Sequence, residues 1–409
     1  MNDASIHRKK HKEKLRICIL GGASFHIYAW AQGLAKRGNE VYIITDQEPD
    51  VDYLIDIESL GVRTYKLPFS NRMFFYFNAF PLRNLLRKLK PNVLFSHYFT
   101  TYGFLGALSG FRPHISFVWG IETFVRRIFP HRARNLKGKL KATFNYWFSK
   151  FALNHIDIIQ SPSRLVVELA KRIGAPRVER CFRGAEKEVF EKVNKEKMEE
   201  WRSNLRIPLN AKVVLDPRPG LRGKLCILEA LQIIKNNFGY PVIFIILRGV
   251  PQGGKERDVD LTPLIYKVKE KKLEEFVRVI NCSLPPNEVA VLFHISDAFL
   301  SLAAQEDLSR MVLEGMLCGC LPILSSNLAN REIIEDYGVK AFLVNNIYDP
   351  KEIGEAIFRA LEIDSCEREK IIKYNKEWVL QNATWEMTIE KTLKLFDECL
   401  SRHSPQARR

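Results

Sequence analysis

One local pattern recurs along the chain from residue 15 onwards: a short apolar run, a tight turn, a longer segment with helical spacing, and another apolar run. Its first copy comprises residues 16–20, the turn Gly21-Gly22-Ala23, the segment 27–37 closed by Gly38, and residues 40–45. A strand, a helix and a second strand in this order form a β-α-β unit, and consecutive units build a parallel sheet. The pattern therefore predicts a doubly wound α/β protein.

Two series of such units occur. The first continues through strands predicted at residues 93–96, 115–118 and 156–160. The second comprises strands predicted at residues 212–216, 242–247, 276–280, 298–302, 321–324 and 341–344. Because 409 residues exceed one ordinary core, and because the charged, weakly apolar segment 187–206 separates the series, we expect two domains.

We expect the chain to divide as follows. Residues 1–14 form a disordered basic tail, 15–190 an N-terminal doubly wound domain, 191–206 a linker, and 207–384 a C-terminal doubly wound domain. Residues 385–409 contain a final helix that packs back on the N-terminal domain.

The charge balance restricts the classes of partner. A net charge of +16 predicts attraction to phosphates, to nucleic acid or to an anionic membrane surface. The eight cysteines are scattered through apolar runs, which is typical of reduced thiols in a cytoplasmic protein. Residues 7–14 are basic and lack the apolar stretch of a signal peptide, and the uncharged run 91–111 contains polar residues and glycines that fit a strand and a buried helix. We therefore expect a cytoplasmic protein.

Ligands of doubly wound sheets bind where the strands end at their carboxyl edge. In the first series this place holds Gly21-Gly22, which lacks the Gly-x-Gly-x-x-Gly fingerprint of dinucleotide sites and is also compatible with a plain turn. In the second series Arg218, Arg222 and Lys224 follow the first strand and precede a helix predicted at residues 225–234. Guanidinium groups there can fork onto a diphosphate, although a solvated basic loop is the simpler alternative.

Two carboxylates with seven residues between them mark the next candidate site. Glu306 follows the strand predicted at 298–302, and Glu314 lies inside an apolar helix, where a carboxylate needs a polar partner. The helix start near Leu308, Ser309 and Arg310 offers unpaired N–H groups and a positive dipole end to a phosphate. A surface glutamate and a capping glutamate are the alternative. Eight helical residues rise by about 12 Å, which is too far for two carboxylates acting on one glycosidic bond and disfavours a hydrolase.

Metal and nucleic-acid sites are not predicted. The strings Asp50-Val-Asp52 and Asp258-Val-Asp260 lie in charged, turn-rich loops rather than at strand ends, and Cys318-Gly-Cys320 lacks a second pair at zinc spacing. A nucleic-acid-binding protein would need its cations on a surface groove with exposed aromatic residues, whereas the motifs here converge on a cleft between the domains. We expect neither a metal nor another cofactor.

The chain resembles the family-4 retaining glycosyltransferases of the GT-B fold over about residues 15–395. The strongest stretch is Glu306-Asp-Leu-Ser-Arg-Met-Val-Leu-Glu314, followed by Gly315 to Pro322 and Asn330-Arg-Glu332, which is similar to the family's Glu-x7-Glu motif. Weaker similarities follow the family order: Phe95-Ser-His97, Trp119-Gly-Ile-Glu122, Ser161-Pro-Ser163, Arg183-Gly-Ala-Glu186 and Ala383-Thr-Trp385. The resemblance implies two doubly wound Rossmann-like domains that face each other across a cleft. It places the N-terminal domain (15–190) on the acceptor side and assigns binding of the nucleotide-sugar to the C-terminal domain (207–384).

The resemblance also implies an activity: metal-independent transfer of a hexose from a nucleoside-diphosphate-sugar, with retention, to a glycan, lipid-linked or small-molecule acceptor. Such enzymes serve polysaccharide or glycolipid biosynthesis. The resemblance assigns Glu306 to the sugar hydroxyls and Glu314 to the ribose. The expected catalytic residues are Glu306, Arg218, Arg222 and His97. With Glu314, the expected donor contacts are Gly21, Gly22, Lys224, Leu308, Ser309 and Arg310, and we expect Gly120 and Glu122 on the acceptor side of the cleft.

Two departures from the family pattern leave roles open. The family commonly has His-Gly or His-Asp where Trp119-Gly120 stands, and Lys where Arg222 aligns. His97 is a candidate for the catalytic histidine, or it is a buried histidine with a structural hydrogen bond. Arg222 keeps the positive charge, with Lys224 as the alternative. A nucleotide-sugar epimerase of the same architecture and a non-catalytic nucleotide-sugar-binding protein remain alternatives, and the residues leave the nucleobase, sugar, acceptor and oligomeric state open.

A basic and aromatic stretch lies between residues 124 and 151. Its cations are Arg126, Arg127, Arg132, Arg134, Lys137, Lys139 and Lys141. Packing of a helix against the following strand explains many of its aromatic residues, and contact with anionic lipid head groups or a lipid-diphosphate acceptor would explain the cations. Two interpretations follow: the protein associates peripherally with the cytoplasmic face of a membrane, or the acceptor is soluble and the positive charge serves only the nucleotide.

Overall fold

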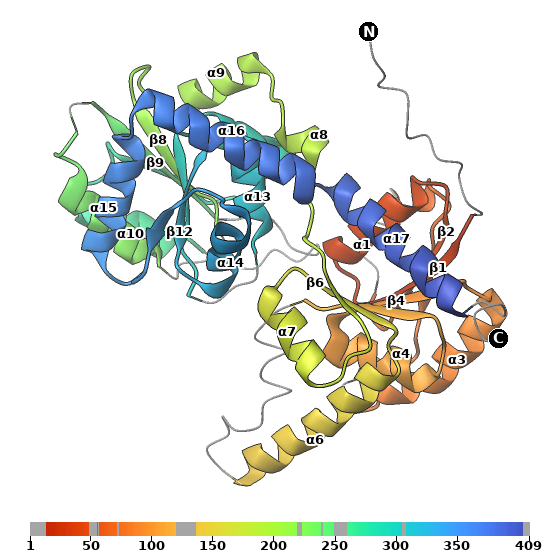
Figure 1. Cartoon of the computed structure of the whole chain (residues 1–409). Helices are drawn as coiled ribbons and strands as arrows, with labels where there is room; N and C mark the ends of the chain where they lie inside the picture. The colour runs from red at the N-terminus through yellow and green to blue at the C-terminus, as the bar shows by residue number, and fades with distance from the viewer. Residues whose placement is uncertain are drawn as a thin grey trace.

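The computed structural model describes residues 14–48, 55, 57–71, 73–119, 136–218, 223–238, 240–248, 260–304 and 308–403. Two α/β domains stand side by side, each built around its own parallel sheet (Figure 1). The N-terminal strands and the orange and yellow helices form the first domain, and the green and blue elements up to α16 form the second.

The first sheet has seven strands in the order β3-β2-β1-β4-β5-β6-β7, all parallel. The strands are β1 (Arg16–Leu20), β2 (Glu40–Thr45), β3 (Arg63–Lys66), β4 (Val93–His97), β5 (His114–Phe117), β6 (Ile158–Ser161) and β7 (Val178–Arg180). Its helices are α1 (Phe25–Ala35), η1 (Phe75–Asn78), α3 (Ala79–Leu89), η2 (Tyr98–Gly103), α4 (Phe104–Ser109), α6 (Leu136–Asn154) and α7 (Arg164–Arg172).

The second sheet has six parallel strands in the order β10-β9-β8-β11-β12-β13. The strands are β8 (Lys212–Asp216), β9 (Val242–Leu247), β10 (Val277–Ile280), β11 (Ala298–Ser301), β12 (Leu321–Ser325) and β13 (Phe342–Val344). Its helices are α8 (Lys187–Phe190), α9 (Lys195–Asn204), α10 (Lys224–Ile234), α11 (Thr262–Glu270), α12 (Pro286–His294), α13 (Arg310–Leu317), α14 (Leu328–Tyr337), α15 (Pro350–Leu361) and α16 (Ser365–Asn382). In each sheet the chain adds strands first on one side of the starting strand, β1 or β8, and then on the other side, beginning with β4 or β11. This order is the Rossmann-like arrangement.

The central strands agree with the apolar pattern. β1, β2, β8 and β9 have the predicted bounds, and the doubly wound fold is confirmed. The sequence did not predict β3 and β7, because their segments Arg63-Thr-Tyr-Lys66 and Val178-Glu-Arg180 are polar. Both strands lie at the edges of the first sheet, where one side of the strand faces solvent and an apolar run is not required.

The segment expected to be a linker is part of the second domain. Helices α8 and α9 pack against α12: Phe190 is buried in the second domain's core, and the Trp201 indole donates to Glu288 Oε2 at 2.5 Å. The chain instead crosses between the domains just before α8. There Ala185 pairs with Thr384 in a short parallel bridge, so the outgoing and returning crossings are held together. Gly184 lies so close to this bridge that an added Cβ would stand 2.2 Å from the Trp385 nitrogen, which leaves room for no other residue.

The last helix, α17 (Trp385–His403), lies on the first domain beside α1 (Figure 1). Trp385 packs edge-on against Trp30, with ring centroids 5.4 Å apart. Gln160 Nε2 on β6 donates to Thr392 Oγ1 at 3.0 Å, and Phe396 is fully buried in the first domain's core. The C-terminal helix therefore completes the N-terminal domain. None of the described helices is long and apolar enough to cross a membrane.

Glu332 on α14 joins the two domains through a buried carboxylate. It accepts hydrogen bonds from the backbone N–H groups of Arg164 and Leu165 at 2.7 and 3.0 Å, from Ser163 Oγ at 3.2 Å, and from the Arg180 guanidinium at 3.2 Å. Those N–H groups begin α7, where the helix dipole also favours a negative charge. The second domain therefore caps a helix of the first.

We predict that Glu332→Ala lowers the free energy of unfolding by about 3 kcal/mol, because Arg180 and the first N–H groups of α7 lose their buried partner. Chemical denaturation followed by circular dichroism measures the loss. Glu335→Ala is the matched control: it lies on the same helix, its side chain is 55% exposed, and it pairs with Arg164 only at the surface. It should cost less than about 1 kcal/mol. Equal losses in the two variants would contradict the assigned role of Glu332.

Candidate functional site: a cleft between the domains

The carboxyl edges of the two sheets face each other. In the first domain, Trp119 and Ser163 follow the carboxyl ends of β5 and β6. In the second, Leu308 follows β11 and Glu332 follows β12. The contacts that join the domains come from these segments, as in the bond from Ser163 to Glu332. Because ligands of doubly wound sheets bind at this edge, the space between the domains is the candidate site.

An ion triad lies on the second domain's side of the cleft. Arg310 donates to Glu314 Oε1 at 2.8 Å and to Glu186 Oε1 at 3.2 Å, so one guanidinium joins α13 to the crossing before α8. Glu314 is buried, and this guanidinium is the polar partner that the sequence predicted it to need. Burial raises the pKa of Glu186, with Arg310 opposing the shift and Glu314 adding to it. Burial opposes the charge of Arg310, but Glu314 and Glu186 together raise its pKa.

An aromatic group lies on the first domain's side. The rings of His26 and Trp119 stack with centroids 4.7 Å apart, and the Arg183 guanidinium covers Trp119 at 5.0 Å. Arg183 also donates to the Leu308 carbonyl at 3.3 Å, so it spans the cleft. Burial lowers the pKa of His26 well below its usual value, and the charges of Arg183 and Arg310 lower it further. A neutral imidazole therefore stands at the start of α1, facing a cluster of positive charge.

His97 is a structural histidine. Its side chain is fully buried, and its Nδ1 accepts a hydrogen bond of 2.9 Å from the Trp119 indole. Burial lowers the pKa of His97 to about 3, so the ring is neutral near pH 7. The expectation of a catalytic His97 is therefore not supported: a ring without solvent exposure does not reach a substrate. Its geometry suits orienting Trp119, the residue that stands where the family commonly has histidine.

The predicted diphosphate cations differ in their placement. Lys224 was expected to face the donor, but only 2% of its side chain is exposed and its Nζ lies 2.6 Å from Asp216 Oδ2. A lysine buried with a carboxylate joins the end of β8 to the start of α10 and is not an open cation. Arg218 is half-buried between the ends of β8 and β11, where it donates to Ser301 Oγ at 3.4 Å. It therefore stands at the point where the strand order of the second sheet reverses.

The remaining predicted positions fall into two groups. Glu306, Arg222, Gly120 and Glu122 lie outside the described residues. Leu308 is buried, and Ser309 occupies the N-cap of α13 with extended backbone and no side-chain cap. The Ser309 side chain does not cap the first N–H groups of α13, and the phosphate site expected at these groups stays a prediction.

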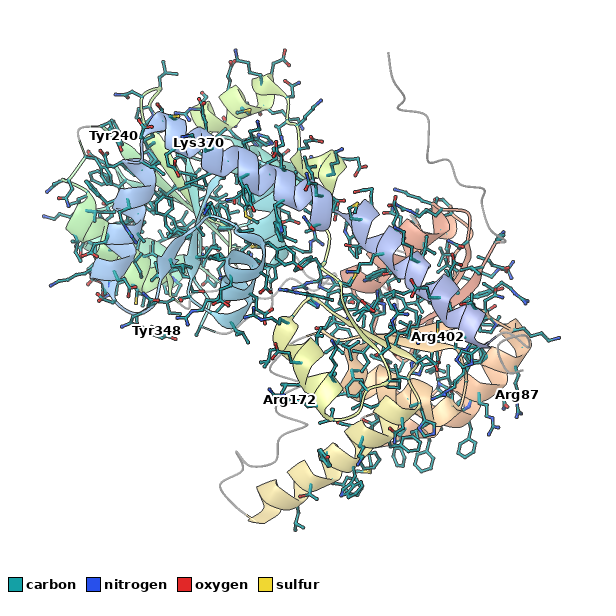
Figure 2. All side chains as sticks on the ribbon, in the orientation of Figure 1. Arg87, Arg172, Tyr240, Tyr348, Lys370 and Arg402 are labelled. Atoms are coloured by element: carbon teal, nitrogen blue, oxygen red, sulfur yellow. The ribbon has the colours of Figure 1, made fainter. Side chains whose placement is uncertain are left out.

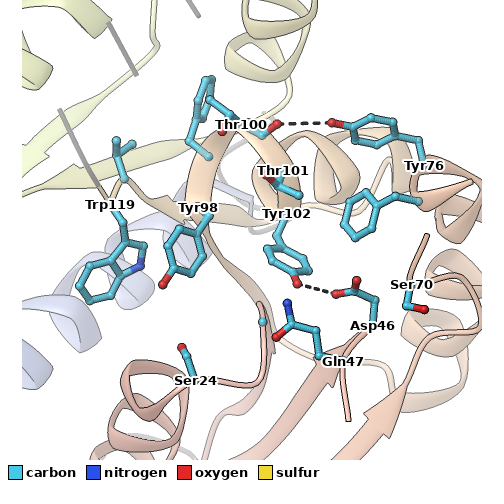
Figure 3. A pocket seen from close by; sticks show the side chains of 14 residues that line it. Ser24, Asp46, Gln47, Ser70, Tyr76, Tyr98, Thr100, Thr101, Tyr102 and Trp119 are labelled. Atoms are coloured by element: carbon cyan, nitrogen blue, oxygen red, sulfur yellow. Dashed lines mark hydrogen bonds between the residues drawn. The ribbon is translucent and has the colours of Figure 1, made fainter. Parts of the chain in front are cut away.

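A second part of the cleft lies within the first domain, with a volume of about 620 Å³ (Figure 3). Its walls are mostly hydroxyl, amide and aromatic side chains; the residues are Gly22, Ser24, Asp46, Gln47, Ser70, Phe75, Tyr76, Tyr98, Phe99, Thr100, Thr101, Tyr102, Val118 and Trp119. Tyr102 donates to Asp46, and Tyr76 donates to the Thr100 carbonyl at 3.5 Å. We name this space the polar cleft.

The backbone that lines the polar cleft is irregular. Tyr98 has a φ of +60°, a conformation that bulky residues rarely adopt, and it begins the π-helix η2. Strained residues and π-turns concentrate at functional sites. The Gly21-Gly22 turn borders the same space, where an added Cβ on Gly22 would stand 3.1 Å from Gln47 Oε1. Sequence reasoning missed Tyr98, Tyr102 and Gln47, although a run of hydroxyl residues directly after a strand was a usable signal.

Among the described residues, one group could offer three metal ligands: Asp157, Cys399 and His403. It lies at the amino end of β6, at the edge opposite the cleft. Asp157 accepts from His403 at 3.0 Å and pairs with Arg112 at 3.6 Å, so the group is explained as an anchor for α17. Of the two Asp-x-Asp strings, only Asp260 is described, and it caps the turn at Thr262.

We predict that His97 makes the protein less stable in acid. Its pKa of about 3 lies below the value near 6.5 of an unfolded histidine, so its contribution is fully present above pH 6.5 and is lost as the pH falls towards 3. When the pH falls from 6.5 to 5, the free energy of unfolding of the wild type should decrease by about 2 kcal/mol more than that of His97→Gln. Phe95→Leu, a neighbouring non-titrating change, should keep the wild-type pH dependence. An unchanged slope in His97→Gln would count against the buried neutral imidazole.

Two family models match the chain: Glycosyltransferase Family 4 over residues 20–186 and Glycosyl transferases group 1 over residues 224–378. The chain is similar to spore coat protein SA of Bacillus subtilis, with 32% identity over 28% of this chain and 30% of that protein. It is also similar to D-inositol 3-phosphate glycosyltransferase of Corynebacterium urealyticum, with 24% identity over 52% of this chain and 49% of that protein. The chain thus spans at most about half the length of these relatives.

Among solved structures, the Anabaena protein HepE in complex with UDP has the same fold, with a TM-score of 0.73 and 15% identity over 94% of this chain and all of that one. This likeness confirms the GT-B arrangement of two Rossmann-like domains. The two family models fall on the two domains, one on each, and together they span most of the described sequence. The chain therefore belongs to the family-4, group 1 glycosyltransferases.

Proposed function

We propose that this protein is a retaining, metal-independent glycosyltransferase that moves a hexose from a nucleoside diphosphate to an acceptor hydroxyl in the cleft between its domains. The observation that carries the proposal is the position of Glu314. Its buried carboxylate lies on α13 at the carboxyl edge of the second sheet, and Arg310 joins it to the crossing between the domains. We assign the reaction to the cytoplasm.

The second domain would bind the nucleotide. Arg310 donates to Glu314 Oε1 through Nε at 3.1 Å and through Nη2 at 2.8 Å, and we assign the ribose hydroxyls to the Glu314 carboxylate. The N–H groups at the start of α13, together with Arg218 and Arg222, would receive the diphosphate. HepE structures hold UDP, UDP with glucose, and UDP-glucose, which supports a nucleoside-diphosphate-sugar and makes UDP-sugars the first donors to test.

The chemical step breaks the bond between the sugar C1 and the diphosphate oxygen, and negative charge builds on the departing diphosphate. Fixed donors that meet this charge lower the barrier, since they need no reorganisation during the reaction. Arg218 is positioned for this by Ser301, while the buried pair of Lys224 and Asp216 would hold the loop that carries it. We assign Glu306 to the sugar hydroxyls. The acceptor hydroxyl would enter from the polar cleft. Its oxygen would bond to C1 on the face that the diphosphate leaves, which retains the configuration, and its proton would pass to the departing diphosphate oxygen.

We predict that Glu314→Ala weakens the binding of a nucleoside diphosphate by about 10- to 100-fold, the loss expected for a hydrogen bond to a charged group. A thermal-shift panel of nucleoside diphosphates and their sugars identifies the ligand, and titration calorimetry measures the loss. Glu306→Ala should mainly slow transfer. The matched control is Glu335→Ala, a surface carboxylate on α14. Wild-type affinity in Glu314→Ala and wild-type rate in Glu306→Ala would refute the site.

We further predict that transfer continues in excess chelator. The cations proposed to meet the diphosphate belong to the protein, so a divalent ion is not required for its charge. Rates with the identified donor are measured before and after addition of EDTA, and then after addition of excess magnesium or manganese. Loss of activity that either ion restores would contradict this prediction.

The same assay distinguishes the alternatives. A transferase forms one glycosylated acceptor for each nucleoside diphosphate released. An epimerase isomerises the sugar or releases free nucleotide without any acceptor. A binding protein gives a thermal shift without turnover.

A further inference from the structure

Exposed aromatic residues gather on one part of the first domain. Among the described residues, every exposed phenylalanine and tryptophan lies between residues 69 and 151: Phe69, Phe74, Phe77, Phe80, Phe144, Trp147, Phe148 and Phe151. Met73, Tyr76, Leu108 and Leu140 in the same region are also exposed. The exposed large apolar residues of the second domain are scattered leucines, isoleucines and tyrosines. A gathered patch of this kind marks an interaction surface, whereas scattered residues need no explanation.

The patch is continuous across several elements. Tyr76 of η1 packs edge-on against Phe104 of α4 at 5.0 Å, and Phe104 packs against Phe148 of α6 at 4.7 Å. Phe148 contacts Phe144 one turn earlier at 4.4 Å. These contacts join η1, α4 and α6 into one surface, which we name the aromatic face. Figure 1 shows α6 projecting from the body of the first domain.

A groove connects the aromatic face to the polar cleft. It has a volume of about 200 Å³ and is lined by Tyr76, Phe99, Thr100, Phe104, Phe144, Phe148, Ser149 and Ala152. Tyr76, Phe99 and Thr100 also line the polar cleft, and Figure 3 shows Tyr76 and Thr100 along one side of it. A further hollow of about 340 Å³ shares Tyr76 and lies among Met73, Phe77, Phe80 and Leu108. The surroundings thus change from hydroxyl groups to aromatic rings along one path.

Positive charge accompanies the aromatic residues. Residues 59–156 contain sixteen lysines and arginines and one acidic residue, Glu122, a surplus of fifteen charges in a chain whose net charge is +16. Arg83, Arg87, Lys88 and Lys90 are exposed on or just after α3, and Figure 2 shows Arg87 pointing away from the first domain. The predicted cations Arg126, Arg127, Arg132 and Arg134 lie outside the described residues, and the side chains of Lys137, Lys139 and Lys141 are not described either. An apolar surface bordered by cations suits the interface of an anionic bilayer.

The polar cleft suits an uncharged, hydroxyl-rich head group. Its described walls contain one charged residue, Asp46, and neither lysine nor arginine. Sugar hydroxyls pair with carboxylate, amide and hydroxyl groups, and sugar rings pack on aromatic side chains such as Tyr98 and Trp119. Phosphate would instead require cations, and none of the described residues that line the polar cleft is a lysine or an arginine.

We propose that the acceptor is a membrane glycolipid, an inference that rests on the proposed transferase function. Its sugar head occupies the polar cleft, the first part of its apolar tail lies in the groove between η1, α4 and α6, and the tail continues into an anionic bilayer on which the aromatic face docks. The arrangement brings the acceptor hydroxyl to the cleft without removing the lipid from the membrane. The donor stays soluble and enters from the second domain.

Vesicle flotation tests the docking surface without any nucleotide. The wild type should float with vesicles that contain phosphatidylglycerol and stay behind with phosphatidylcholine alone. Phe77→Ser with Phe80→Ser, and separately Arg83→Glu with Arg87→Glu, should each reduce the bound fraction several-fold. The matched controls change exposed residues of the second domain, Tyr266→Ser with Tyr348→Ser and Lys370→Glu with Lys373→Glu, and should float like the wild type. Equal effects of test and control variants, or no flotation of the wild type, would overturn the proposal.

Fluorescence locates the contact. Trp147 on α6 is 61% exposed, whereas the other five tryptophans are buried or half-buried. Vesicles of brominated phosphatidylglycerol should therefore quench the wild-type protein, and Trp147→Phe should lose most of that quenching while still floating. Equal quenching of both proteins would place the membrane contact elsewhere and overturn the assigned face.

The groove is tested with decyl maltoside below its micelle concentration and with maltose as the tail-free control. Calorimetry should show the alkyl glycoside binding at least about tenfold more tightly than maltose, because the tail is buried. Ser149→Phe fills the groove and should remove this advantage. An unchanged melting temperature and unchanged nucleoside diphosphate binding will show that the variant is folded. If Ser149→Phe keeps the tail's advantage, the groove is not the tail site. These readouts need no transfer, so their failure differs from failure at Glu314, which appears only in nucleotide binding.

Discussion

The cleft depends on one buried carboxylate. The Glu332 side chain extends from α14 of the second domain to the first domain. There it accepts hydrogen bonds from the first two N–H groups of α7, from Ser163 and from Arg180. A carboxylate without solvent has to keep such partners, since an uncompensated buried charge costs several kcal/mol. A rotation of one domain that preserves these bonds has to pivot at this contact. Arg310 bridges Glu186, just before α8, to Glu314, the residue proposed to bind the nucleotide, so this ion triad joins the proposed donor site to the crossing between the domains.

Pairing decides what the other charges of the site can do. Lys224 and Arg218 belong to one short segment of sequence, yet Lys224 is buried against Asp216 while Arg218 stays half-exposed at the strand ends. The sequence shows which residues are cationic, but burial and the nearest carboxylate decide which cation a ligand can meet. The same reasoning applies to His97 and His26. Both are neutral because burial opposes their charge, but only His26 stands beside the arginines that span the cleft.

The sequence predicted the architecture well where a central strand requires an apolar run. β1, β2, β8 and β9 are such strands, while the polar edge strands β3 and β7 carry no such signal. The segment 191–206 appeared to be a linker because it is highly charged, yet a helix with one apolar side, including Trp201, is enough to pack on the second domain. For the site, the motif around Glu314 predicted its neighbourhood. The polar cleft could not be predicted from it, because Asp46, Tyr76 and Tyr98 come from separate segments that meet only in the fold.

The two domains divide the physical properties of the chain between them. Residues 59–156 of the first domain contain nearly the whole surplus of positive charge and every described exposed phenylalanine and tryptophan, whereas the second domain holds the buried ion pairs at its strand ends. Like charges on a surface repel one another, and exposed aromatic rings leave apolar area in water, so both lower stability. A nucleotide site in the second domain does not require charges or aromatic rings on the surface of the first. The proposed membrane glycolipid would require them, because its tail would stay in a low-dielectric phase beside the first domain. In this proposal a water-soluble donor and a membrane-bound acceptor meet in the cleft, with the polar walls of the first domain around the sugar head and the aromatic walls around the tail.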